Sequence, residues 1–418
     1  MINSGARIAK QRLVVLGSGW SSFALIRAID AKRFDTTVIS DRNNFIFTPL
    51  LASAAVGTIE FRAASESVRQ TRPDVHFHQA AATHIDAAKK LVTVTDSFTG
   101  KPYTYAFDKL VIGTGAESAT FGIPGVRENA LFLKTLADAR AIRSKMLANL
   151  EAASNPFLDD AERRRLCSFV VVGGGPTSVE LLGELSDALK EAAKFFPDAA
   201  PLVKLTLVES SGQLLSSFDA KLGEYTRRAF KKRNIEVILS ARVTKVSSQH
   251  VHVAMSGGNE RILEHGMLVW STGIGPTEFL KSLPFEKSGW KLKVDELLRL
   301  PAHADIFAIG DISDTGLPAT AQVAQQEGRF VAKVLNAGDA AVPPSAFVYR
   351  HLFSLAYIGQ FSAIVDSGSG GALNARGFGA FVLWRLAYWT TAVSWRNKLL
   401  IPMFWFKTFW LGRDLSRF

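Results

Sequence analysis

Short apolar runs recur along the chain and are separated by longer, more polar stretches with helical periodicity. Apolar runs that end at glycine or at an acidic residue predict strands buried on both faces of a sheet. The predicted strands of this kind are 13–16, 36–40, 109–116, 169–172, 204–208, 267–275 and 305–313. Segments 75–78 and 91–95 predict antiparallel strands joined through 86–90. This alternation of strands and helices is typical of an α/β fold with a parallel sheet.

The first predicted strand leads into a glycine turn that opens a helix, Gly17–Ser22. Gly17 permits a tight turn, and Gly19 lets a pyrophosphate approach backbone N–H groups at the helix N-terminus. Ser22 stands where a third glycine is usual, and it is small enough for close helix–strand packing. The next strand ends at Asp41, whose carboxylate can accept hydrogen bonds from ribose hydroxyls. Ordinary turns share the glycine pattern, but the strand before it and the acid after it favour dinucleotide binding.

The same order of elements occurs a second time. Strand 169–172 is followed by Gly173–Glu180, strand 204–208 delivers Glu209, and 267–275 repeats the Thr-Gly ending of the earlier strand 109–116. Two such sets predict two Rossmann-like dinucleotide-binding domains. Two nucleotide sites in one polypeptide imply two cofactors in electronic contact, and the usual pairing is a tightly held flavin and a diffusible nicotinamide.

A further strand, 305–313, ends in Gly310-Asp311 and follows the second set. Asp311 can hydrogen-bond the ribityl and phosphate region of FAD, or it can cap a helix. Because this strand comes after the second set, the first domain is predicted to be split by the second. The predicted boundaries are 1–130 with 285–345 for FAD, 131–284 for NADH and 346–418 for membrane association.

A helix is predicted to start after Pro318 and Thr320. Its positive end, aimed at the flavin, would stabilise the negative charge of the reduced cofactor. Its first turns carry three amides, Gln322, Gln325 and Gln326. On a solvated helix these amides would have no functional meaning.

The segment 377–418 differs from the rest of the chain. It holds five of the eight tryptophans, and its six basic residues face one acid, Asp414. No apolar run reaches the roughly 18 residues that a membrane-spanning helix needs. Two amphipathic helices, 378–394 and 397–411, separated near Trp395-Arg396, fit helices that lie in a membrane interface. An aromatic-rich dimer interface is the alternative, and dimerisation can share the surface.

Charge and cysteine content narrow the function. The net charge of +11 is compatible with nucleic acid or an anionic membrane. No nucleic-acid-binding signature accompanies this charge, so the basic and aromatic segment 377–418, the C-terminal tail, favours lipid as the partner. Cys167 is the only cysteine, which excludes an intramolecular disulfide and a two-thiol redox centre. The first twelve residues are basic but lack the apolar run of a secretory signal.

Together these residues resemble the type II NADH:quinone oxidoreductases, the single-subunit, rotenone-insensitive alternative NADH dehydrogenases. The resemblance covers nearly the whole chain, and it rests on 17–20, 47–51, 173–180, 308–311, 321–328 and 355–359. Segment 321–328 and the Trp- and Arg-rich tail are its specific parts, because many flavin disulfide reductases share the glycine motifs. The ending Gly412-Arg413-Asp414 is more similar to the mitochondrial branch than to most bacterial members. No calcium-binding loop is inserted.

The resemblance implies that NADH passes hydride to FAD and that the reduced flavin reduces a quinone, expected to be ubiquinone, without proton pumping. Motifs and resemblance together assign FAD to Gly17, Gly19, Trp20, Asp41, Thr48, Pro49, Thr114, Gly115, Gly310, Asp311, Ala321 and Gln322. They assign NADH to Gly173, Gly175, Pro176, Thr177, Glu180, Glu209, Thr272 and Gly273. The quinone is assigned to Gln322, Gln325 and Tyr357, and the catalytic candidates are Glu180, Gln322 and Gln325. Glu180 either lies near the nicotinamide or braces its helix, and no metal is expected.

The resemblance also implies a peripheral protein, expected as a homodimer at the mitochondrial inner membrane, or at the cytoplasmic membrane of a prokaryote. Sulfide:quinone, thioredoxin- and glutathione-type reductases need a pair of redox cysteines, so the lone Cys167 argues against them. The alternatives that stay open are another FAD-dependent NAD(P)H oxidoreductase and a flavin-binding signalling protein of the same fold.

Overall fold

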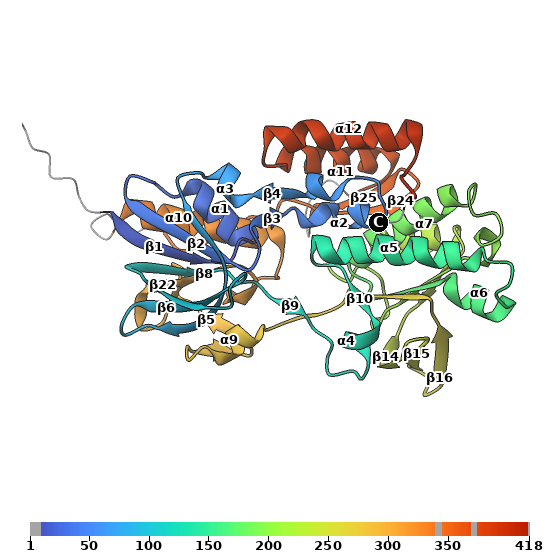
Figure 1. The fold of residues 1–418 in the computed structure, drawn as a ribbon, viewed down its shortest axis with the longest axis horizontal. Helices are drawn as coiled ribbons and strands as arrows, with labels where there is room; N and C mark the ends of the chain where they lie inside the picture. Colours follow the sequence, from blue (N-terminus) through green and yellow to red (C-terminus); the bar gives the residue numbers. More distant parts are fainter. Residues whose placement is uncertain (1–9, 339–344, 369–373, 417–418) are drawn as a thin grey trace, which may run out of the picture. The chain divides into compact units, whose positions relative to one another are not determined.

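A large sheet is built around the first predicted strand. In the computed structural model, which describes residues 10–338, 345–368 and 374–416, this strand is β1 (Gln11–Leu16), and its last four side chains are buried. The strand order is β21 (Arg299–Leu300), β22 (His303–Ala308), β8 (Lys109–Ile112), β1, β2 (Phe34–Ser40), β5 (His76–Asp86), β6 (Leu91–Asp96) and β7 (Pro102–Ala106). Figure 1 labels β1, β2, β5, β6, β8 and β22 of this sheet. Neighbours from β22 to β5 pair in parallel, whereas β6, β7 and β21 add antiparallel pairs. Successive side chains of a strand point to opposite faces of the sheet, and the last four of β1 are all buried. Both faces are therefore covered at β1, which is why its sequence is apolar without alternation.

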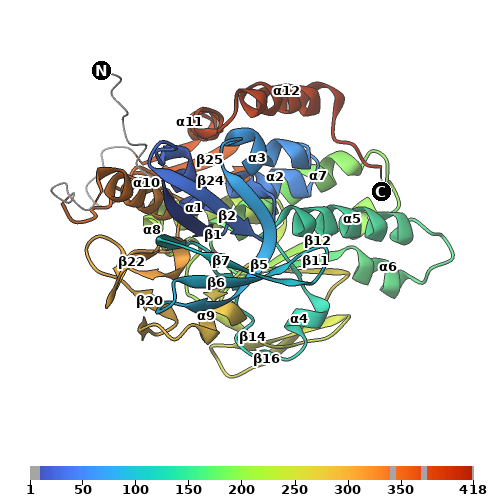
Figure 2. The ribbon, with the colours of Figure 1, turned by 60° about the vertical axis from the view of Figure 1, so that its left-hand side comes forward.

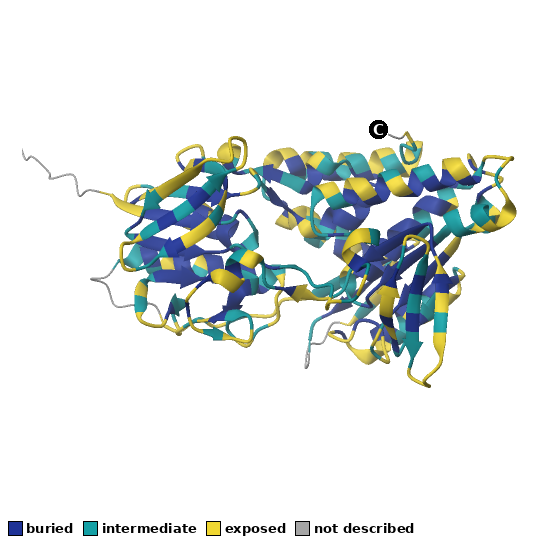
Figure 3. Cartoon of the chain, turned by 60° about the horizontal axis from the view of Figure 1, so that its bottom comes forward, coloured by how far each residue is buried: buried dark blue, intermediate teal, exposed yellow. Residues whose placement is uncertain are grey.

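A second, smaller sheet is built around the second predicted strand. Its order is β10 (Leu131–Phe132), β17 (Met267–Trp270), β11 (Ser168–Val172), β12 (Lys204–Val208) and β13 (Ile235–Ile238), and every pair is parallel. Two antiparallel sheets accompany it: β14 (Ala241–Val246), β15 (His250–Met255) and β16 (Glu260–Glu264); and β24 (Ser354–Gly359), β25 (Ser362–Asp366) and β26 (Ala375–Gly377). Buried residues, dark blue in Figure 3, concentrate in the sheets.

The chain folds into two compact units, and each holds one of these sheets. The first contains the chain up to Ile46, Ser65–Glu117 and Ile274–Arg350. The second contains Phe47–Ala64, Ser118–Gly273 and the chain from His351 onward. The chain changes unit five times, after residues 46, 64, 117, 273 and 350. Two short strands, β9 (Glu117–Ser118) and β18 (Ile274–Gly275), lie at the third and fourth of these points. Each unit therefore contains one predicted glycine turn, while the cofactor-domain boundaries given above stay a prediction.

The helices of the first unit are α1 (Trp20–Ala28), α3 (Val68–Thr71), α9 (Glu278–Ser282) and α10 (Ala321–Ala337). Its remaining strands are β3 (Asn44–Ile46), β4 (Ser65–Ser67), β19 (Lys287–Ser288), β20 (Lys291–Lys293) and β23 (Ser313–Asp314). Helices α1 and α10 pack closely side by side (Figure 2). A Cβ added at Gly328 of α10 would lie 2.0 Å from the carbonyl oxygen of Ser21 in α1, so glycine is needed at this crossing.

The helices of the second unit are α2 (Leu51–Ala55), α4 (Val126–Asn129), α5 (Leu136–Ala153), α6 (Asp160–Leu166), α7 (Pro176–Ala192), α8 (Ala220–Lys231), α11 (Phe378–Thr391) and α12 (Trp395–Leu411). The Arg-rich segment 136–165, whose sequence pattern predicts helix, forms two helices, α5 and α6. Asn155-Pro156 lies in the break, because proline disfavours the helical conformation of the residue before it. The side chain of Asn155 accepts from the N–H of Phe157 and forms a turn there.

Two other local predictions differ from the structure. The segment 42–51 contains aromatic residues, a threonine and a proline, a composition that predicts a stiff loop. In the structure part of it forms β3, which pairs antiparallel with β4, and a 3-10 helix at Thr48–Leu50. The predicted helix 378–394 ends at Thr391, and Ser394 caps α12 through the N–H of Asn397. Trp395 therefore starts α12 instead of separating two helices. Residues 1–9, most of the basic segment that lacks the apolar run of a secretory signal, lie outside the described residues.

The C-terminal helices are apolar on their exposed side as well as on their buried side. Ala380, Phe381 and Trp384 of α11 and Ile401 and Trp405 of α12 are buried. The exposed large apolar residues of the two helices are Phe378, Val382, Leu383, Leu386, Trp389, Trp395, Leu399, Met403, Phe406, Phe409, Trp410 and Leu411. Among the described residues, no helix combines the length and apolar character needed to cross a membrane.

Candidate functional site

The two predicted glycine turns have the same backbone geometry. Gly17 has φ +100°, and a Cβ added to it would lie 2.3 Å from the carbonyl oxygen of Gly113. Gly173 has φ +115°, and its added Cβ would lie 2.5 Å from the carbonyl oxygen of Ser271. In each case the segment after a neighbouring strand passes directly beside the turn. Only glycine fits there, which is the first requirement of the dinucleotide fingerprint.

The serines that replace the third glycine occupy matching places. The hydroxyl of Ser22 lies 3.4 Å from the carbonyl oxygens of both Leu16 and Gly113. The hydroxyl of Ser178 donates to the carbonyl oxygen of Ser271 at 3.1 Å. Both serines are fully buried, so each ties its helix to the strands below without adding bulk. The sequence repeat is therefore a repeat of hydrogen bonds as well.

Both turns leave the start of a helix open. Gly19 and Gly175 are the N-cap residues of α1 and α7. In the described part of the chain no side chain caps either helix, and a Cβ added at either glycine would meet nothing within 4 Å. Such an end attracts the phosphates of a nucleotide. Beside the first turn, the hydroxyl of Thr114 is buried without a hydrogen-bond partner among the described residues, and a Cβ at Gly115 would also meet open space. These features fit FAD, whose phosphates and hydroxyls would pair with them.

The other predicted FAD residues are spread over both units. In the first unit, Trp20 packs edge-to-face on Phe45 with ring centroids 4.9 Å apart, and the carboxylate of Asp41 is exposed at the end of β2. Gly310 has φ +81° and leads into Asp311, directly after β22. Ala321 and Gln322 begin α10. Thr48 and Pro49 lie in the second unit.

The three glutamines of α10 have different surroundings. Thr320 caps the helix through the N–H of Val323, as the sequence pattern predicts for a helix start. Gln326 makes two hydrogen bonds to the backbone of Arg350, at 2.9 and 3.0 Å, so its amide has a structural role. Gln322 and Gln325 are half-buried in the first unit, whereas Tyr357 lies in the second unit.

Glu209 lies against the second glycine turn. A Cβ added at Gly174 would come within 2.8 Å of the Glu209 side chain. One carboxylate oxygen accepts from the N–H of Ser211 at 2.6 Å and from the hydroxyl of Ser210 at 3.2 Å. The acid is thus fixed beside the turn where a nucleotide ribose is expected.

The other predicted NADH residues flank this turn. Pro176 is the first residue of α7, and Thr177 follows it. At this position an N–H would have no partner within the helix, so its absence in proline costs no hydrogen bond. Thr272 and Gly273 follow β17. A Cβ at Gly273, which has φ +72°, would lie 2.3 Å from the ring of Phe121, so the ring packs on this glycine.

Glu180 faces the C-terminal elements of its own unit. One carboxylate oxygen, Oε1, accepts from the N–H of Tyr357 in β24 at 3.1 Å and from the indole N–H of Trp384 in α11 at 2.9 Å. Burial raises the pKa of Glu180 to about 8, although both hydrogen bonds favour the charged form. The group can therefore hold a proton at neutral pH, and the predicted contact with nicotinamide stays a prediction.

Three more acids follow Glu180 on α7, and sequence reasoning missed them. The buried carboxylate of Glu184 accepts from the hydroxyls of Ser53 and Thr58 at 2.6 Å each. Asp187 accepts from the hydroxyl of Tyr357 at 2.6 Å, and Glu191 pairs with Arg413 at 2.6 Å. Their spacing of three and four residues places them on one helix face, and that spacing was the signal in the sequence.

A pocket of about 330 Å³ opens beside these acids. Its walls include Glu184, Asp187 and Tyr357, together with aromatic residues of α11 and α12. Arg385 stacks on the rings of Phe381 and Trp405, and its Nε is buried without a hydrogen-bond partner among the described residues.

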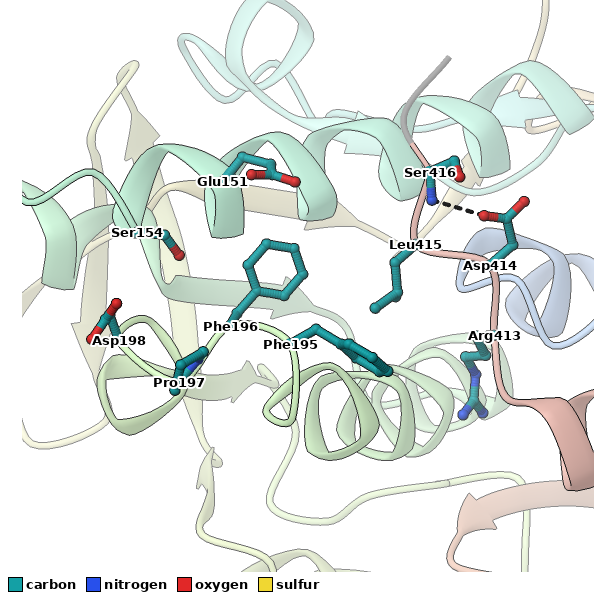
Figure 4. Close-up of a pocket in the computed structure, with 10 residues that line it drawn as sticks. All are labelled: Glu151, Ser154, Phe195, Phe196, Pro197, Asp198, Arg413, Asp414, Leu415 and Ser416. Carbon is teal, nitrogen blue, oxygen red and sulfur yellow. Dashed lines mark hydrogen bonds between the residues drawn. The ribbon is translucent and has the colours of Figure 1, made fainter.

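A second pocket, of about 600 Å³, lies around the last described residues (Figure 4). Phe195, Phe196 and Leu415 line it, and the N–H of Ser416 donates to Asp414 at 2.8 Å. None of its ten lining residues is among the predicted site residues.

The lone thiol is in a structural position. Cys167 is fully buried, and burial raises the pKa of its thiol to about 11. A thiol that stays protonated is a poor nucleophile and a poor redox group. In the part of the chain that the structure describes, no group of three or more His, Cys, Asp or Glu side chains is arranged to hold a metal.

Sequence comparisons place the chain in a family. A model of pyridine nucleotide-disulphide oxidoreductases matches residues 11–328, and a model of the NDH2 C-terminal domain matches residues 351–414. An Arabidopsis thaliana protein named internal alternative NAD(P)H-ubiquinone oxidoreductase A1, mitochondrial, is 40% identical over 443 residues, which cover 98% of this chain and 86% of that protein. The chain belongs to the type II NADH dehydrogenase (NDH2) family. This confirms the family that the motifs predicted.

Solved structures agree with this assignment. The NDH2 structure from Plasmodium falciparum in complex with NADH has a TM-score of 0.92 and 26% identity, and covers 97% of this chain and 100% of that one. The sulfide:quinone oxidoreductase of Aquifex aeolicus, with a TM-score of 0.72 and 20% identity over 97% of this chain and 96% of that one, shares the fold. The predicted α/β fold is confirmed, and an NDH2 enzyme uses FAD and NADH.

Proposed function

We propose that this chain oxidises NADH with bound FAD and reduces ubiquinone. The carrying observation is the repeated turn: two glycine turns with the same close approach, each opening an uncapped helix and each followed by an acid. The names of the curated relatives, which include an external NADH-ubiquinone oxidoreductase of Saccharomyces cerevisiae at 36% identity over 98% of this chain and 83% of that protein, support the reaction. When bound, FAD accepts the electrons of NADH and delivers them to the quinone.

The first unit would hold FAD. Its phosphates would meet the open N-terminus of α1 at Gly19, and the unpartnered hydroxyl of Thr114 would donate to the cofactor. Asp41 would accept from the adenosine ribose, and Asp311 would accept from the ribityl chain. These contacts are hydrogen bonds, so we expect the flavin to be held without a covalent link.

The second unit would hold NADH at Gly173 and Gly175, with Glu209 on the ribose. Glu180 would hold a proton on Oε2, because Oε1 already accepts two N–H groups. Its side chain is oriented by Trp384 and Tyr357, which makes the α7 carboxylates and the C-terminal elements one hydrogen-bonded network.

The direct test is NADH oxidation by the purified protein with a soluble ubiquinone, combined with acid precipitation. We expect a yellow protein that releases its flavin on precipitation and reduces the quinone. A flavin-binding signalling protein would hold flavin without turning over NADH. Flavin that stayed with the precipitated polypeptide would contradict the non-covalent binding.

Glu209 should make the enzyme prefer NADH over NADPH. Its carboxylate would repel a 2′-phosphate, and Ser210 and Ser211 supply no arginine to neutralise that phosphate. A repulsion of about 1–2 kcal/mol gives roughly tenfold discrimination or more. Glu209→Gln should narrow the ratio of the two kcat/KM values, whereas Asp41→Asn, in the other glycine set, should not change it. Equal kcat/KM values for both nucleotides in the natural protein would rule this role out.

Gln322 and Gln325 should act only in the quinone half-reaction. Replacing either by alanine should raise the KM for ubiquinone several-fold and leave the rate of flavin reduction by NADH nearly unchanged. Gln326→Ala is the matched control, because its amide is already engaged by Arg350. Stopped-flow traces measure the two half-reactions separately. Slower flavin reduction in the Gln322 or Gln325 variants would place these amides on the nicotinamide side instead.

We further propose that the enzyme is peripheral to the mitochondrial inner membrane. The relatives named as mitochondrial support the organelle, and the exposed aromatic face of α11 and α12 supports contact with the membrane surface. Interfacial helices bind through apolar insertion and through attraction of basic residues to anionic lipids. The homodimer expected from the sequence stays a prediction, and sedimentation of the detergent-free enzyme would test it.

A further inference from the structure

A buried carboxylate in the first unit has no role in the reaction described so far. Glu327 lies in the second turn of α10, and its side chain is fully buried. Its Oε2 accepts the N–H of Gly310 at 2.5 Å. Both of its oxygens lie 3.1 Å from the hydroxyl of Ser313, and Oε1 lies 3.4 Å from the hydroxyl of Thr315. All four contacts are with one short segment, 310–315.

The hydrogen bonds are complete when Glu327 carries a proton. The Ser313 hydroxyl has one hydrogen, and the carbonyl oxygen of Gly310 lies 2.8 Å away to accept it. A protonated Glu327 would then donate to Ser313 while its other oxygen accepts from Gly310. Burial raises the pKa of Glu327 to about 7, which is consistent with a proton held in this network.

The clamped segment lies where three predicted FAD-binding pieces meet. A Cβ added at Gly310 would lie 2.8 Å from the hydroxyl of Ser21, the second residue of α1. Gly328, the neighbour of Glu327, packs against the backbone of the same serine. The first glycine turn, the Gly310-Asp311 segment and α10 are therefore in direct contact around Glu327.

We propose that Glu327 is a positioning residue that locks the Gly310-Asp311 segment to α10. Because Gln322 and Gln325 lie on the same helix, this clamp sets the FAD contacts and the quinone-side amides as one piece. The inference rests on the proposed function, since it assumes that Asp311 binds FAD and that the glutamines face the quinone. Glu327 itself acts through Gly310 and Ser313.

The test compares three variants of the full-length holoenzyme. Glu327→Gln keeps one acceptor for Gly310 and one donor for Ser313, so it reproduces the protonated form. Glu327→Ala removes the clamp. Leu335→Ala, at a buried apolar position of the same helix, removes packing without touching the segment 310–315. The readouts are FAD release, followed by flavin fluorescence after dilution, and the KM for ubiquinone.

We expect Glu327→Ala to release FAD at least about tenfold faster than the natural protein, because the N–H of Gly310 loses its buried carboxylate acceptor. Its KM for ubiquinone should rise as well. Glu327→Gln should stay within about twofold of the natural protein in both readouts. Leu335→Ala should lower the melting temperature without faster FAD release at temperatures where it is folded.

Two results would overturn the clamp: equal FAD release by Glu327→Ala and Leu335→Ala at matched stability, or a Gln variant that behaves like the Ala variant. A natural protein that holds FAD but does not oxidise NADH would contradict the proposed function alone, and FAD release would still test the clamp. A natural protein that retains no FAD would contradict both.

Discussion

Replacing Glu180 by glutamine should stabilise the protein increasingly as the pH rises from 5 to 8. The folded protein ionises this carboxyl near pH 8 and not near its usual value of 4.5. Between these values the unfolded chain has lost a proton that the folded protein retains, so the free energy of unfolding falls as the pH rises. For one such group the free energy of unfolding changes by about 1.4 kcal/mol per pH unit. Glutamine does not titrate, and its oxygen can accept both N–H groups that now bind Oε1.

The measurement is denaturant unfolding of both proteins across this pH range, and the difference between them isolates Glu180. We expect the difference to level off above about pH 8, where both states of the natural protein are ionised. Glu224→Gln is the control, since pairing with Arg227 and Arg228 lowers the pKa of Glu224 to about 2. The free energy of unfolding of this control variant should not rise relative to that of the natural protein at alkaline pH. A difference for Glu180→Gln that does not change with pH would show that the buried carboxyl is ionised throughout.

Polar substitutions on the exposed face of α12 should release the protein from membranes without unfolding it. Leu399, Phe406 and Trp410 are 72%, 66% and 67% exposed, so replacing them by serine removes little packing. Each large side chain that leaves a lipid interface forfeits about 1.5–3 kcal/mol, so the triple variant should bind liposomes at least about a hundredfold more weakly. Co-sedimentation with vesicles that contain anionic lipid measures this, and salt should detach the natural protein only in part.

The matched control replaces three other exposed aromatic residues, Phe98, Phe157 and Phe195, by serine. It removes similar apolar area outside the C-terminal helices and should leave liposome binding unchanged. Removal of the whole segment 377–418 is a poorer experiment, because it also takes away Trp384 and Arg413, which pair with buried acids of α7. If the α12 variant bound liposomes as well as the natural protein, its exposed face would be better explained as a contact with a second copy of the chain.

Local patterns in the sequence predicted the framework well. The run Leu13–Leu16 and its counterpart in β11 became central strands, and each predicted glycine turn became a tight turn that opens a helix. These features depend on neighbours in the chain and on glycine's conformational freedom, so they can be read directly. The break between α5 and α6 was missed, although Asn155-Pro156 marked it.

The contacts of the candidate site could not be predicted in the same way. Trp384 donates to Glu180 across 204 positions of sequence, and Gly310 donates to Glu327 from a different element. A helix carrying acids at intervals of three and four residues predicts a polar face, but not its partners. Only the tertiary fold shows that the face of α7 is buried and that its acids meet hydroxyls, an indole and Arg413.

The contacts of Arg413 affect how far the second unit can fold while the chain is still being synthesised. Its guanidinium pairs with Glu184 and Glu191 of α7 and lies 3.1 Å from the hydroxyl of Thr58. The ribosome completes α7 long before it reaches residue 413. The nascent second unit therefore contains Glu184 and Glu191 without the guanidinium group that pairs with them in the folded protein. Removing one member of a buried ion pair is strongly destabilising. The second unit therefore cannot reach its final stability before Arg413 has left the ribosome and paired with these acids.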